Sequence, residues 1–493
     1  MKKILINGEW VSSSSKNTIE ILNPATLEVI DQVPDCNDAD VNSAVRAAKR
    51  AQVSWAKVSG LEKATLLREV GRKIRENEKE LSTLMTRETG KPLCESVDCI
   101  DWIAAVFEYY AEVGRQSRGN SIPPVAPHQV NFTIKEPYGV VAAICPFNFP
   151  LLLMCWKVAP ALAAGNTVVC KAPHQNPLSN LLLGKVYDHL PPGVVNILTG
   201  NGSTTGEALI QHPDIDLIAF TGSTAVGRHI ASIAGKHLKK INLELGGIDP
   251  FIVFEDANLD VAVPGVAWAR LLNSGQVCTS SKRIYVVDKI YDEFVKRLHE
   301  YVKTPKLGDP MNPETDMGPL ISKEALEKVE KQVKTVLEEG ARLLYGGRRV
   351  QPNGLKGYFF EPTLIVDVKH GGYATTEEIF GPVISVIRAK NADHAIEMAN
   401  DSKYGLGANI YTNNLEVAMR AMENIKAGTF WINDPLTDND AAPFGGMRWS
   451  GVGRELGEEG LDAFRDVKHV HMDYVMERKS YWYPYKNRKL PNH

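Results

Sequence analysis

The chain has 493 residues, with 56 lysines and arginines, 59 aspartates and glutamates, and a formal net charge of -3. A single hydrophobic core usually stops growing at about 250 to 300 residues, so we expect at least two domains. Charges of both signs are mixed along the chain, which argues against nucleic-acid or membrane-surface binding through one strongly charged face. A small, neutral or weakly charged substrate fits this balance better.

The cysteines and the N-terminus indicate a reduced, cytoplasmic protein. The seven cysteines are odd in number and form no CxxC pair, so the sequence predicts free thiols and no metal site. Residues 1–10 turn polar before the apolar region of a signal peptide would be complete. No apolar run approaches the roughly 18 residues that a membrane-spanning helix needs.

The first 135 residues change from strands to helices and back to a strand. Short strands are expected between residues 4 and 33, and a helical layer is expected from residue 38 to 118. The segment 116–135 contains three prolines and then alternates apolar and polar residues from Val130 to Ile134. This pattern predicts an excursion that leaves the domain and ends in a strand.

Alternating strands and helices occupy the middle of the chain. Strands are expected at 140–145, 167–171, 194–199, 217–220 and 241–245, with a helix between each pair. Such βα units predict a doubly wound parallel sheet of the kind that binds nucleotides. A second series, with strands at 251–254 and 283–287 and helices at 261–274 and 291–302, predicts a second α/β domain.

Residues 468–475 alternate like a strand near the C-terminus. This strand and the excursion could form a sheet between subunits. They could equally be edge strands of their own domain, and the residue pattern alone leaves both arrangements open.

Three residues carry the chemistry of a thioester. Cys278 follows the pattern Gly-Gln-x-Cys, Glu244 precedes a pair of glycines, and Asn148 lies in Pro-Phe-Asn-Phe-Pro. A cysteine thiolate can attack a carbonyl carbon, a carboxylate can activate water, and an amide can stabilise an oxyanion. Taken singly, each residue also fits a structural role, because most free cysteines behave as small buried hydrophobes.

Together, in this order and with these flanking motifs, the three residues resemble the catalytic core of the NAD(P)-dependent aldehyde dehydrogenase superfamily. The resemblance runs from residue 7 to at least residue 470. It implies that Cys278 is the nucleophile, that Asn148 and the backbone N–H of Cys278 hold the oxyanion, and that Glu244 activates the hydrolytic water.

The resemblance extends to the cofactor site. The stretch 220–227, Phe-Thr-Gly-Ser-Thr-Ala-Val-Gly, lies between a strand and a helix, where backbone N–H groups can receive a pyrophosphate. A Glu-Ile-Phe-Gly-Pro box at 378–382 resembles the family's nicotinamide-ribose box. The implied cofactor residues are Phe147, Lys171, His174, Thr221, Gly222, Ser223, Gly227, Glu378 and Phe380.

His174 leaves the choice between NAD and NADP open. Lys171 resembles the lysine that contacts the adenosine ribose, and many family members carry a glutamate three residues later, where this chain has His174. The missing carboxylate removes a bar against the 2'-phosphate of NADP, and a protonated imidazole would favour it. Alternatively, His174 lies at the rim and NAD binds equally well.

The resemblance implies an aldehyde tunnel with aromatic and aliphatic walls, which suit an apolar substrate. The loop 434–440 adds three aspartates, so a hydroxylated or cationic aldehyde also fits, unless these side chains turn to solvent. No arginine in these segments predicts a carboxylate or phosphate anchor. The implied pocket residues are Phe149, Leu153, Trp156, Val277, Thr279, Asp438 and Phe444.

The resemblance also implies a division of the chain and an oligomer. Residues 1–115 and 138–248 would bind NAD(P), residues 249–448 would form the catalytic domain, and residues 116–137 and 465–493 would bridge subunits of a homodimer or homotetramer. Two other functions are compared with hydrolytic oxidation. The first is a coenzyme A-acylating dehydrogenase, but relatives of that type generally lack the glutamate found here as Glu244. The second is an inactive binding or structural relative, but such a protein has no physical reason to keep all three catalytic residues.

Overall fold

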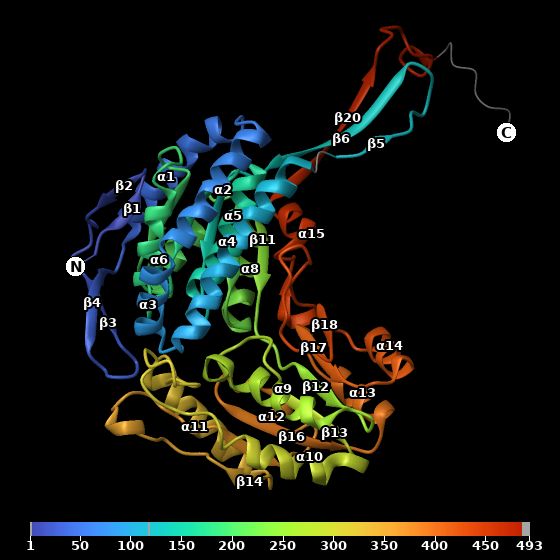
Figure 1. The fold of residues 1–493 in the computed structure, drawn as a ribbon. Helices are drawn as coiled ribbons and strands as arrows, with labels where there is room; N and C mark the ends of the chain where they lie inside the picture. The colour runs from blue at the N-terminus through green and yellow to red at the C-terminus, as the bar shows by residue number, and fades with distance from the viewer. Residues whose placement is uncertain (1, 117–118, 486–493) are drawn as a thin grey trace, which may run out of the picture.

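The structure is a computed structural model, and it describes residues 2–116 and 119–485. Within these residues, two α/β bodies lie one above the other, and a thin β arm leaves the upper body (Figure 1). The expectation of two doubly wound α/β units is confirmed.

The upper body is built on a sheet in the order β19-β11-β10-β7-β8-β9-β1-β2, counted over the described residues. Its five central strands are parallel, whereas β1, β2 and β19 are antiparallel additions at the edges. β7 and β8 are buried at every residue, because helices cover both faces of a parallel sheet. The strands are β1 (Ile4–Ile6), β2 (Glu9–Val11), β7 (Val140–Ile144), β8 (Thr167–Lys171), β9 (Val195–Leu198), β10 (Leu217–Thr221), β11 (Lys240–Glu244) and β19 (Gly451–Val452).

The helical layer predicted after residue 38 covers this sheet (Figure 1). It begins at a capping box, in which the side chain of Asn37 accepts hydrogen bonds from the N–H groups of Ala39 and Asp40. The helices of the upper body are α1 (Asp38–Trp55), α2 (Gly60–Glu76), α3 (Glu78–Thr89), α4 (Leu93–Gln116), α5 (Pro150–Ala164), α6 (Leu178–Leu183), α7 (Glu207–Gln211), α8 (Thr224–His237) and α15 (Gly457–Asp462).

The lower body has a sheet in the order β14-β15-β16-β13-β12-β17-β18, and only β14 is antiparallel within the described residues. Its strands are β12 (Pro250–Val253), β13 (Arg283–Val287), β14 (Arg342–Tyr345), β15 (Thr363–Val366), β16 (Val383–Ala389), β17 (Gly407–Tyr411) and β18 (Thr429–Ile432). Its helices are α9 (Leu259–Leu271), α10 (Asp288–Tyr301), α11 (Lys323–Glu338), α12 (Tyr373–Thr376), α13 (Ala392–Asn400) and α14 (Leu415–Asn424).

Helix α9 ends earlier than the expected residue 274. Asn273 and Ser274 have φ angles of 48° and 56°, which place both in the left-handed region that non-glycine residues seldom adopt. The chain therefore turns sharply just before Cys278, and the loop that carries this cysteine is not a continuation of the helix.

The excursion and the C-terminal strand pair with each other in the same chain. β20 (Arg465–Asp473) runs antiparallel to β6 (Gln129–Pro137), and β5 (Ser121–Ile122) adds a short third strand. Figure 1 shows this arm projecting away from both bodies. Residues 117–118 and 486–493 of the predicted bridging elements lie outside the described residues, and bridging between subunits stays a prediction.

Three further features complete the described chain. A separate two-stranded sheet, β3 (Thr18–Leu22) with β4 (Val29–Pro34), lies at the N-terminal side. After the lower body, β19 and α15 return the chain to the upper body, since β19 pairs with β11. Over the described residues, no helix is long and apolar enough to cross a membrane. The proposed domain boundaries stay a prediction.

Candidate active site

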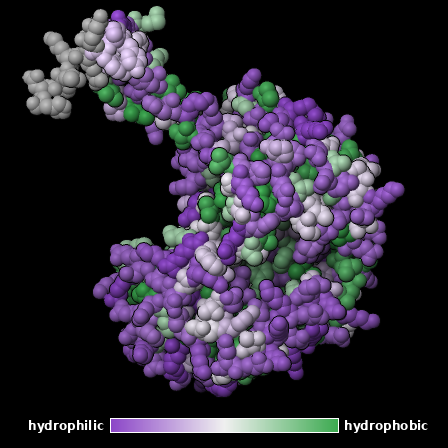
Figure 2. Space-filling model, turned by 180° about the vertical axis from the view of Figure 1, so that it is seen from behind, coloured by the Kyte–Doolittle hydropathy of each residue, from purple (hydrophilic) through white to green (hydrophobic). Residues whose placement is uncertain are grey.

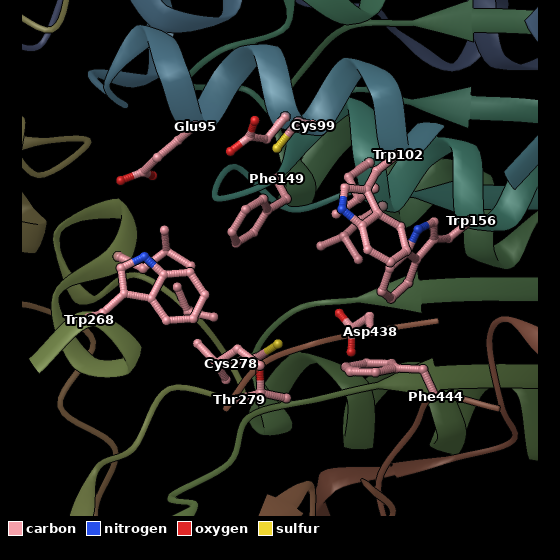
Figure 3. Close-up of a pocket in the computed structure, with 16 residues that line it drawn as sticks. Glu95, Cys99, Trp102, Phe149, Trp156, Trp268, Cys278, Thr279, Asp438 and Phe444 are labelled. Atoms are coloured by element: carbon pink, nitrogen blue, oxygen red, sulfur yellow. The ribbon is translucent and has the colours of Figure 1, made fainter. Parts of the chain in front are cut away.

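A pocket of about 200 Å³ lies between the two bodies and reaches Cys278. Helices α4 and α5 form its upper wall, and the Cys278 loop and the loop 436–444 form the opposite wall (Figure 3). All seven residues that the resemblance implied for the aldehyde tunnel line this pocket. Leu436, from the predicted loop 434–440, also lines it. Seven further lining residues were missed from the sequence: Glu95, Asp98, Cys99, Trp102, Leu152, Trp268 and Leu272.

The pocket is both aromatic and acidic. Trp102, Trp156 and Trp268 contribute indole rings, while none of the lining residues is a lysine, arginine or histidine. The carboxyls of Glu95 and Asp438 lie at opposite sides of the cavity (Figure 3). Burial raises the pKa of each to about 7. The Lys91 ammonium and the N–H of Asn273 partly stabilise the Glu95 carboxylate, whereas no charged group of the described residues offsets the burial of Asp438. An uncompensated carboxylate favours a cationic ligand.

The acidic wall comes from one face of α4. Glu95, Asp98, Cys99 and Trp102 recur at the i, i+3, i+4 and i+7 positions, so they lie along the same stripe of the helix. This spacing was a readable signal in the sequence. It could not be assigned to the site, because nothing in the local pattern shows that α4 faces Cys278.

Cys278 lies half-buried on a loop that long-range contacts hold in a strained conformation. Its pKa is raised to about 12, first by burial and also by Asp249, Glu378 and Glu244, whereas the Lys282 ammonium lowers it. The buried Arg270 donates to the carbonyls of Gly275, Ile379 and Val383 and to Ser280 Oγ. The Arg270 guanidinium therefore connects the Cys278 loop with the Glu-Ile-Phe-Gly-Pro box at residues 378–382.

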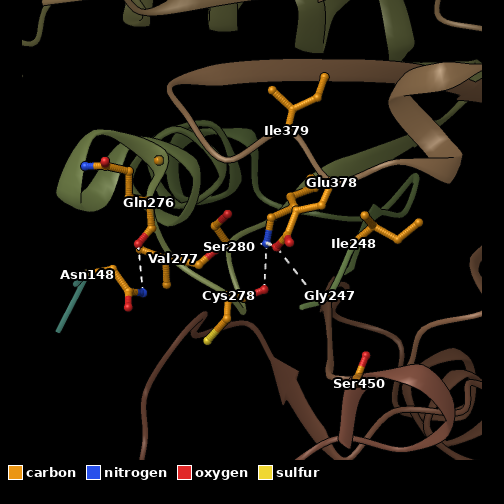
Figure 4. Close-up of polar contacts among 12 residues, drawn as sticks. Asn148, Gly247, Ile248, Gln276, Val277, Cys278, Ser280, Glu378, Ile379 and Ser450 are labelled. Atoms are coloured by element: carbon orange, nitrogen blue, oxygen red, sulfur yellow. Dashed lines mark hydrogen bonds and ion pairs between the residues drawn. The ribbon is translucent and has the colours of Figure 1, made fainter. Parts of the chain in front are cut away.

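Asn148 is positioned beside the nucleophile as the sequence implied. Its Nδ2 donates to the carbonyl of Gln276 at 3.0 Å (Figure 4). An amide NH₂ carries a second proton, which stays available for an oxyanion. The backbone N–H of Cys278 donates to no acceptor among the described residues, so this N–H and the second amide proton of Asn148 are both free of partners there.

Glu244 ends β11 as an isolated buried carboxyl. It is 2% exposed, and neither oxygen has a hydrogen-bond partner within the described residues. Burial, and then the charge of Glu455, raise its pKa well above the usual range. A carboxylate that takes up a proton readily suits a general base that must accept one from water.

Next to Glu244 lies a buried ion pair that the sequence did not predict. Lys157 Nζ contacts Glu455 Oε1 at 2.6 Å and Thr221 Oγ1 at 2.6 Å, and it also donates to the carbonyl of Leu153 at 3.2 Å. Lys157 and Glu455 are both 0% exposed. They are 298 positions apart in the chain, so no local pattern could have paired them.

The implied nicotinamide residues meet in space. The rings of Phe147 and Phe380 are edge to face, with centroids 6.0 Å apart. Glu378 Oε1 lies 3.2 Å from Lys282 Nζ and accepts the N–H of Gly247 at 3.4 Å (Figure 4). A carboxylate in this position can accept hydrogen bonds from ribose hydroxyls.

The Phe-Thr-Gly-Ser stretch forms the turn between β10 and α8, where Ser223 is the N-cap of the helix. Its residues have different local roles: Ser223 Oγ accepts the N–H of Val226, and the Thr221 hydroxyl contacts buried Lys157. Gly227 packs against Leu245, whose side chain occupies the space that a Cβ would need. The N-terminal N–H groups of α8 can still receive a phosphate.

Lys171 is a buried cation with few partners. It is 3% exposed, and its Nζ donates only to the carbonyl of Ala172, at 2.9 Å, among the described residues. Burial lowers its pKa to about 8, so further oxygen ligands would stabilise the ammonium. At His174, desolvation and the Lys171 charge lower the pKa. A neutral imidazole near pH 7 neither repels nor attracts a 2'-phosphate by charge.

Comparison with known proteins identifies the family. The sequence profile of the aldehyde dehydrogenase family matches residues 10–470. The chain belongs to the aldehyde dehydrogenase family. It is therefore an oxidoreductase of the NAD(P)-dependent type, and the resemblance found in its sequence is confirmed.

The relatives agree along nearly the whole chain. Aminoaldehyde dehydrogenase 2 of Pisum sativum, a peroxisomal protein, is 40% identical over 493 residues, covering 98% of this chain and 97% of the relative. Betaine aldehyde dehydrogenase of Staphylococcus aureus, solved with NAD+, has a TM-score of 0.95 and 37% identity, covering 98% of this chain and 97% of that chain. An NADP-dependent enzyme of E. coli has a TM-score of 0.93 and 38% identity, covering 96% and 98%. The cytoplasmic location of this aldehyde dehydrogenase stays a prediction.

Proposed function

We propose that this aldehyde dehydrogenase oxidises aldehydes that carry a cationic amino group, through a thioester on Cys278 that water hydrolyses. The pocket that reaches Cys278 is the supporting observation: Glu95, Asp98 and Asp438 line it together with three tryptophans, and no basic residue lines it. Carboxylates and indole faces attract cations. The aminoaldehyde and betaine aldehyde named for two relatives are cationic substrates of this kind.

The residues act in sequence on the aldehyde carbon. The Cys278 thiolate attacks that carbon, and Asn148 Nδ2 and the backbone N–H of Cys278 stabilise the alkoxide. NAD(P)+, when bound, supplies the acceptor for the hydride that leaves the thiohemiacetal. Glu244 then takes a proton from a water molecule, which attacks the remaining thioester and releases the acid and the Cys278 thiol.

Isosteric pairs of aldehydes test the substrate class. 3-Aminopropanal and butanal have the same chain length, but only the first carries an ammonium group. We expect kcat/KM, measured by formation of reduced cofactor with NAD+ and with NADP+, to be at least about tenfold higher for 3-aminopropanal, since one charge-assisted hydrogen bond contributes about 1.5–3 kcal/mol. An equal or higher value for butanal would refute the cationic class.

Two variants test the assigned chemistry. Cys278→Ala should abolish turnover, and Glu244→Gln should release one burst of reduced cofactor and then stall, because the thioester forms but is not hydrolysed. An unchanged steady state in Glu244→Gln would refute the proposed base. If coenzyme A restored rapid turnover in that variant and also accelerated the unmodified enzyme, the acylating alternative would replace hydrolysis. Flat traces with every aldehyde from folded, cofactor-binding protein would favour the inactive relative.

A further inference from the structure

Lys282 is a buried cation that contacts both the nucleophile loop and the cofactor box. It is 3% exposed. Its Nζ donates to the carbonyls of Val277 at 2.9 Å and Cys278 at 2.6 Å, and it lies 3.2 Å from Glu378 Oε1. All of its ammonium protons therefore point at groups that belong to the reaction centre.

Further contacts fix the position of this side chain. The backbone N–H of Lys282 donates to the carbonyl of Asp249 at 3.1 Å, and its Nζ lies 5.8 Å from the ring centroid of Phe380. Figure 4 shows Cys278, Glu378 and Gly247 close together, with a dashed line between the Glu378 carboxylate and Gly247. A buried ammonium held by several partners has little freedom to move away.

The charges that act on the Cys278 thiol are unbalanced. Asp249, Glu378 and Glu244 all disfavour the thiolate, and Lys282 is the cation that favours it. Glu378 forms an ion pair with Lys282, so its negative charge partly neutralises the Lys282 ammonium. If ribose hydroxyls donated to Glu378, this carboxylate would neutralise less of the Lys282 charge, and more of that charge would act on Cys278.

We propose that Lys282 is a positioning residue that favours the thiolate of Cys278 and makes its reactivity depend on whether Glu378 is engaged by the cofactor. The proposal rests on the assignment of Cys278 as the nucleophile and Glu378 as a ribose ligand. No bond to Lys282 forms or breaks; the thiol proton leaves to solvent, and Lys282 keeps its own protons throughout. The nucleophile is thus held less reactive until a hydride acceptor is bound.

Alkylation of Cys278 by iodoacetamide tests this inference without turnover. The rate is followed by mass spectrometry of the Cys278 peptide from about pH 6 to about pH 11, below the pKa of about 12 of this buried thiol. In this range the rate rises about tenfold per pH unit with the thiolate fraction, so a displacement of the profile reports a shift of the midpoint. The full-length enzyme, Lys282→Met, Lys282→Arg and Glu378→Gln are compared with and without NAD+. Lys403→Met is the matched control, because Lys403 pairs with Glu377 at 2.9 Å, and within the described residues no hydrogen bond or ion pair joins its side chain to the Cys278 loop.

The expected results separate charge from structure. Lys282→Met should move the midpoint of the profile upward by about one pH unit, which lowers the rate about tenfold below the midpoint, while Lys282→Arg and Lys403→Met keep it in place. Glu378→Gln should lower the midpoint without cofactor. NAD+ should lower the midpoint in the unmodified enzyme, and by less in Lys282→Met.

Several outcomes would overturn the proposal. An unmoved profile in Lys282→Met, or an equal displacement in Lys282→Met and Lys282→Arg, would leave Lys282 without the proposed electrostatic role. If Lys282→Met did not fold, an unmoved midpoint in Glu378→Gln, or a raised midpoint in Lys282→Arg, would be decisive against it. Loss of aldehyde oxidation in Cys278→Ala is measured separately, so failure of the proposed function is distinguishable from failure of this inference.

Discussion

Asp438→Asn should convert this enzyme from a preference for cationic aldehydes toward neutral ones. Asp438 lies on the loop after β18, and its carboxyl lines the pocket beside Phe444 and opposite Trp156 (Figure 3). No residue of the described chain donates a hydrogen bond to it or pairs with it. Asparagine keeps the shape of the side chain and removes only the negative charge.

The size of the effect follows from this isolation. A hydrogen bond to a charged group contributes about 1.5–3 kcal/mol, and each 1.4 kcal/mol is a factor of ten. Because Glu95 and Asp98 also attract an ammonium group, the loss is expected at the lower part of that range. We therefore expect kcat/KM for 3-aminopropanal to fall about tenfold to thirtyfold, while kcat/KM for butanal stays within about twofold.

The assay compares both aldehydes at about pH 8, where a carboxyl with a pKa of about 7 is largely ionised. Asp434→Asn is the matched control, since Asp434 lies on the same loop, is exposed and does not line the pocket. A tenfold loss that affects both aldehydes equally would show that Asp438 supports the loop and does not bind the cation. An equal loss in the control would lead to the same conclusion.

Three further outcomes are expected. Gly227→Ala should lower the free energy of unfolding, measured in a thermal melt, by about 1–3 kcal/mol, because the added methyl group overlaps Leu245. Gly235→Ala in the same helix is the control: the space around Gly235 is open, so this substitution should be neutral or stabilising. Burial raises the pKa of Glu95 and of Asp438 to about 7, so both carboxyls become protonated as pH falls below that value. The preference for 3-aminopropanal over butanal should therefore increase as pH rises from about 6 to 8, and a flat ratio would contradict this expectation. Figure 2 shows hydrophobic residues at the surface of the projecting arm. Val130 and Met472 face each other across β6 and β20 and are exposed. We expect these two residues to hold subunits together, so that replacing both by glutamate reduces the mass in light scattering; an unchanged mass would leave the arm without that role.

The sequence predicted best what repeats locally. The strands at 167–171 and 283–287 have the expected bounds, because strands buried on both faces read as short apolar runs between polar breaks. The end of α9 shows what local periodicity cannot predict: the helix was expected to reach residue 274, but it ends at Leu271. Asn273 donates its N–H to Glu95, and Ser274 donates its hydroxyl to the carbonyl of Gly318. These partners are distant in the sequence and hold the left-handed turn, so the helical periodicity around residue 273 could not predict it.

The candidate site divides in the same way. Cys278, Glu244 and Asn148 lie within motifs and could be named from the sequence, whereas Lys282 and Glu95 acquire a role only through their neighbours in space. Lys282 is one of many lysines until the fold places its Nζ against the Cys278 carbonyl and Glu378. Motifs therefore predicted the reaction type, and the proposals for substrate class and nucleophile control required the structure.

The isolation of Glu244 has a stereochemical cause. A lysine ammonium has three protons to donate, and Lys157 directs all three elsewhere, to Glu455, Thr221 and the carbonyl of Leu153. The cation beside Glu244 is thus already saturated and cannot form a hydrogen bond with it. Had Lys157 paired with Glu244, the carboxylate would be stabilised and a weaker base. Glu455 therefore raises the pKa of Glu244 by its own charge and also takes the hydrogen bond of an ammonium that otherwise acts on Glu244 only through its charge.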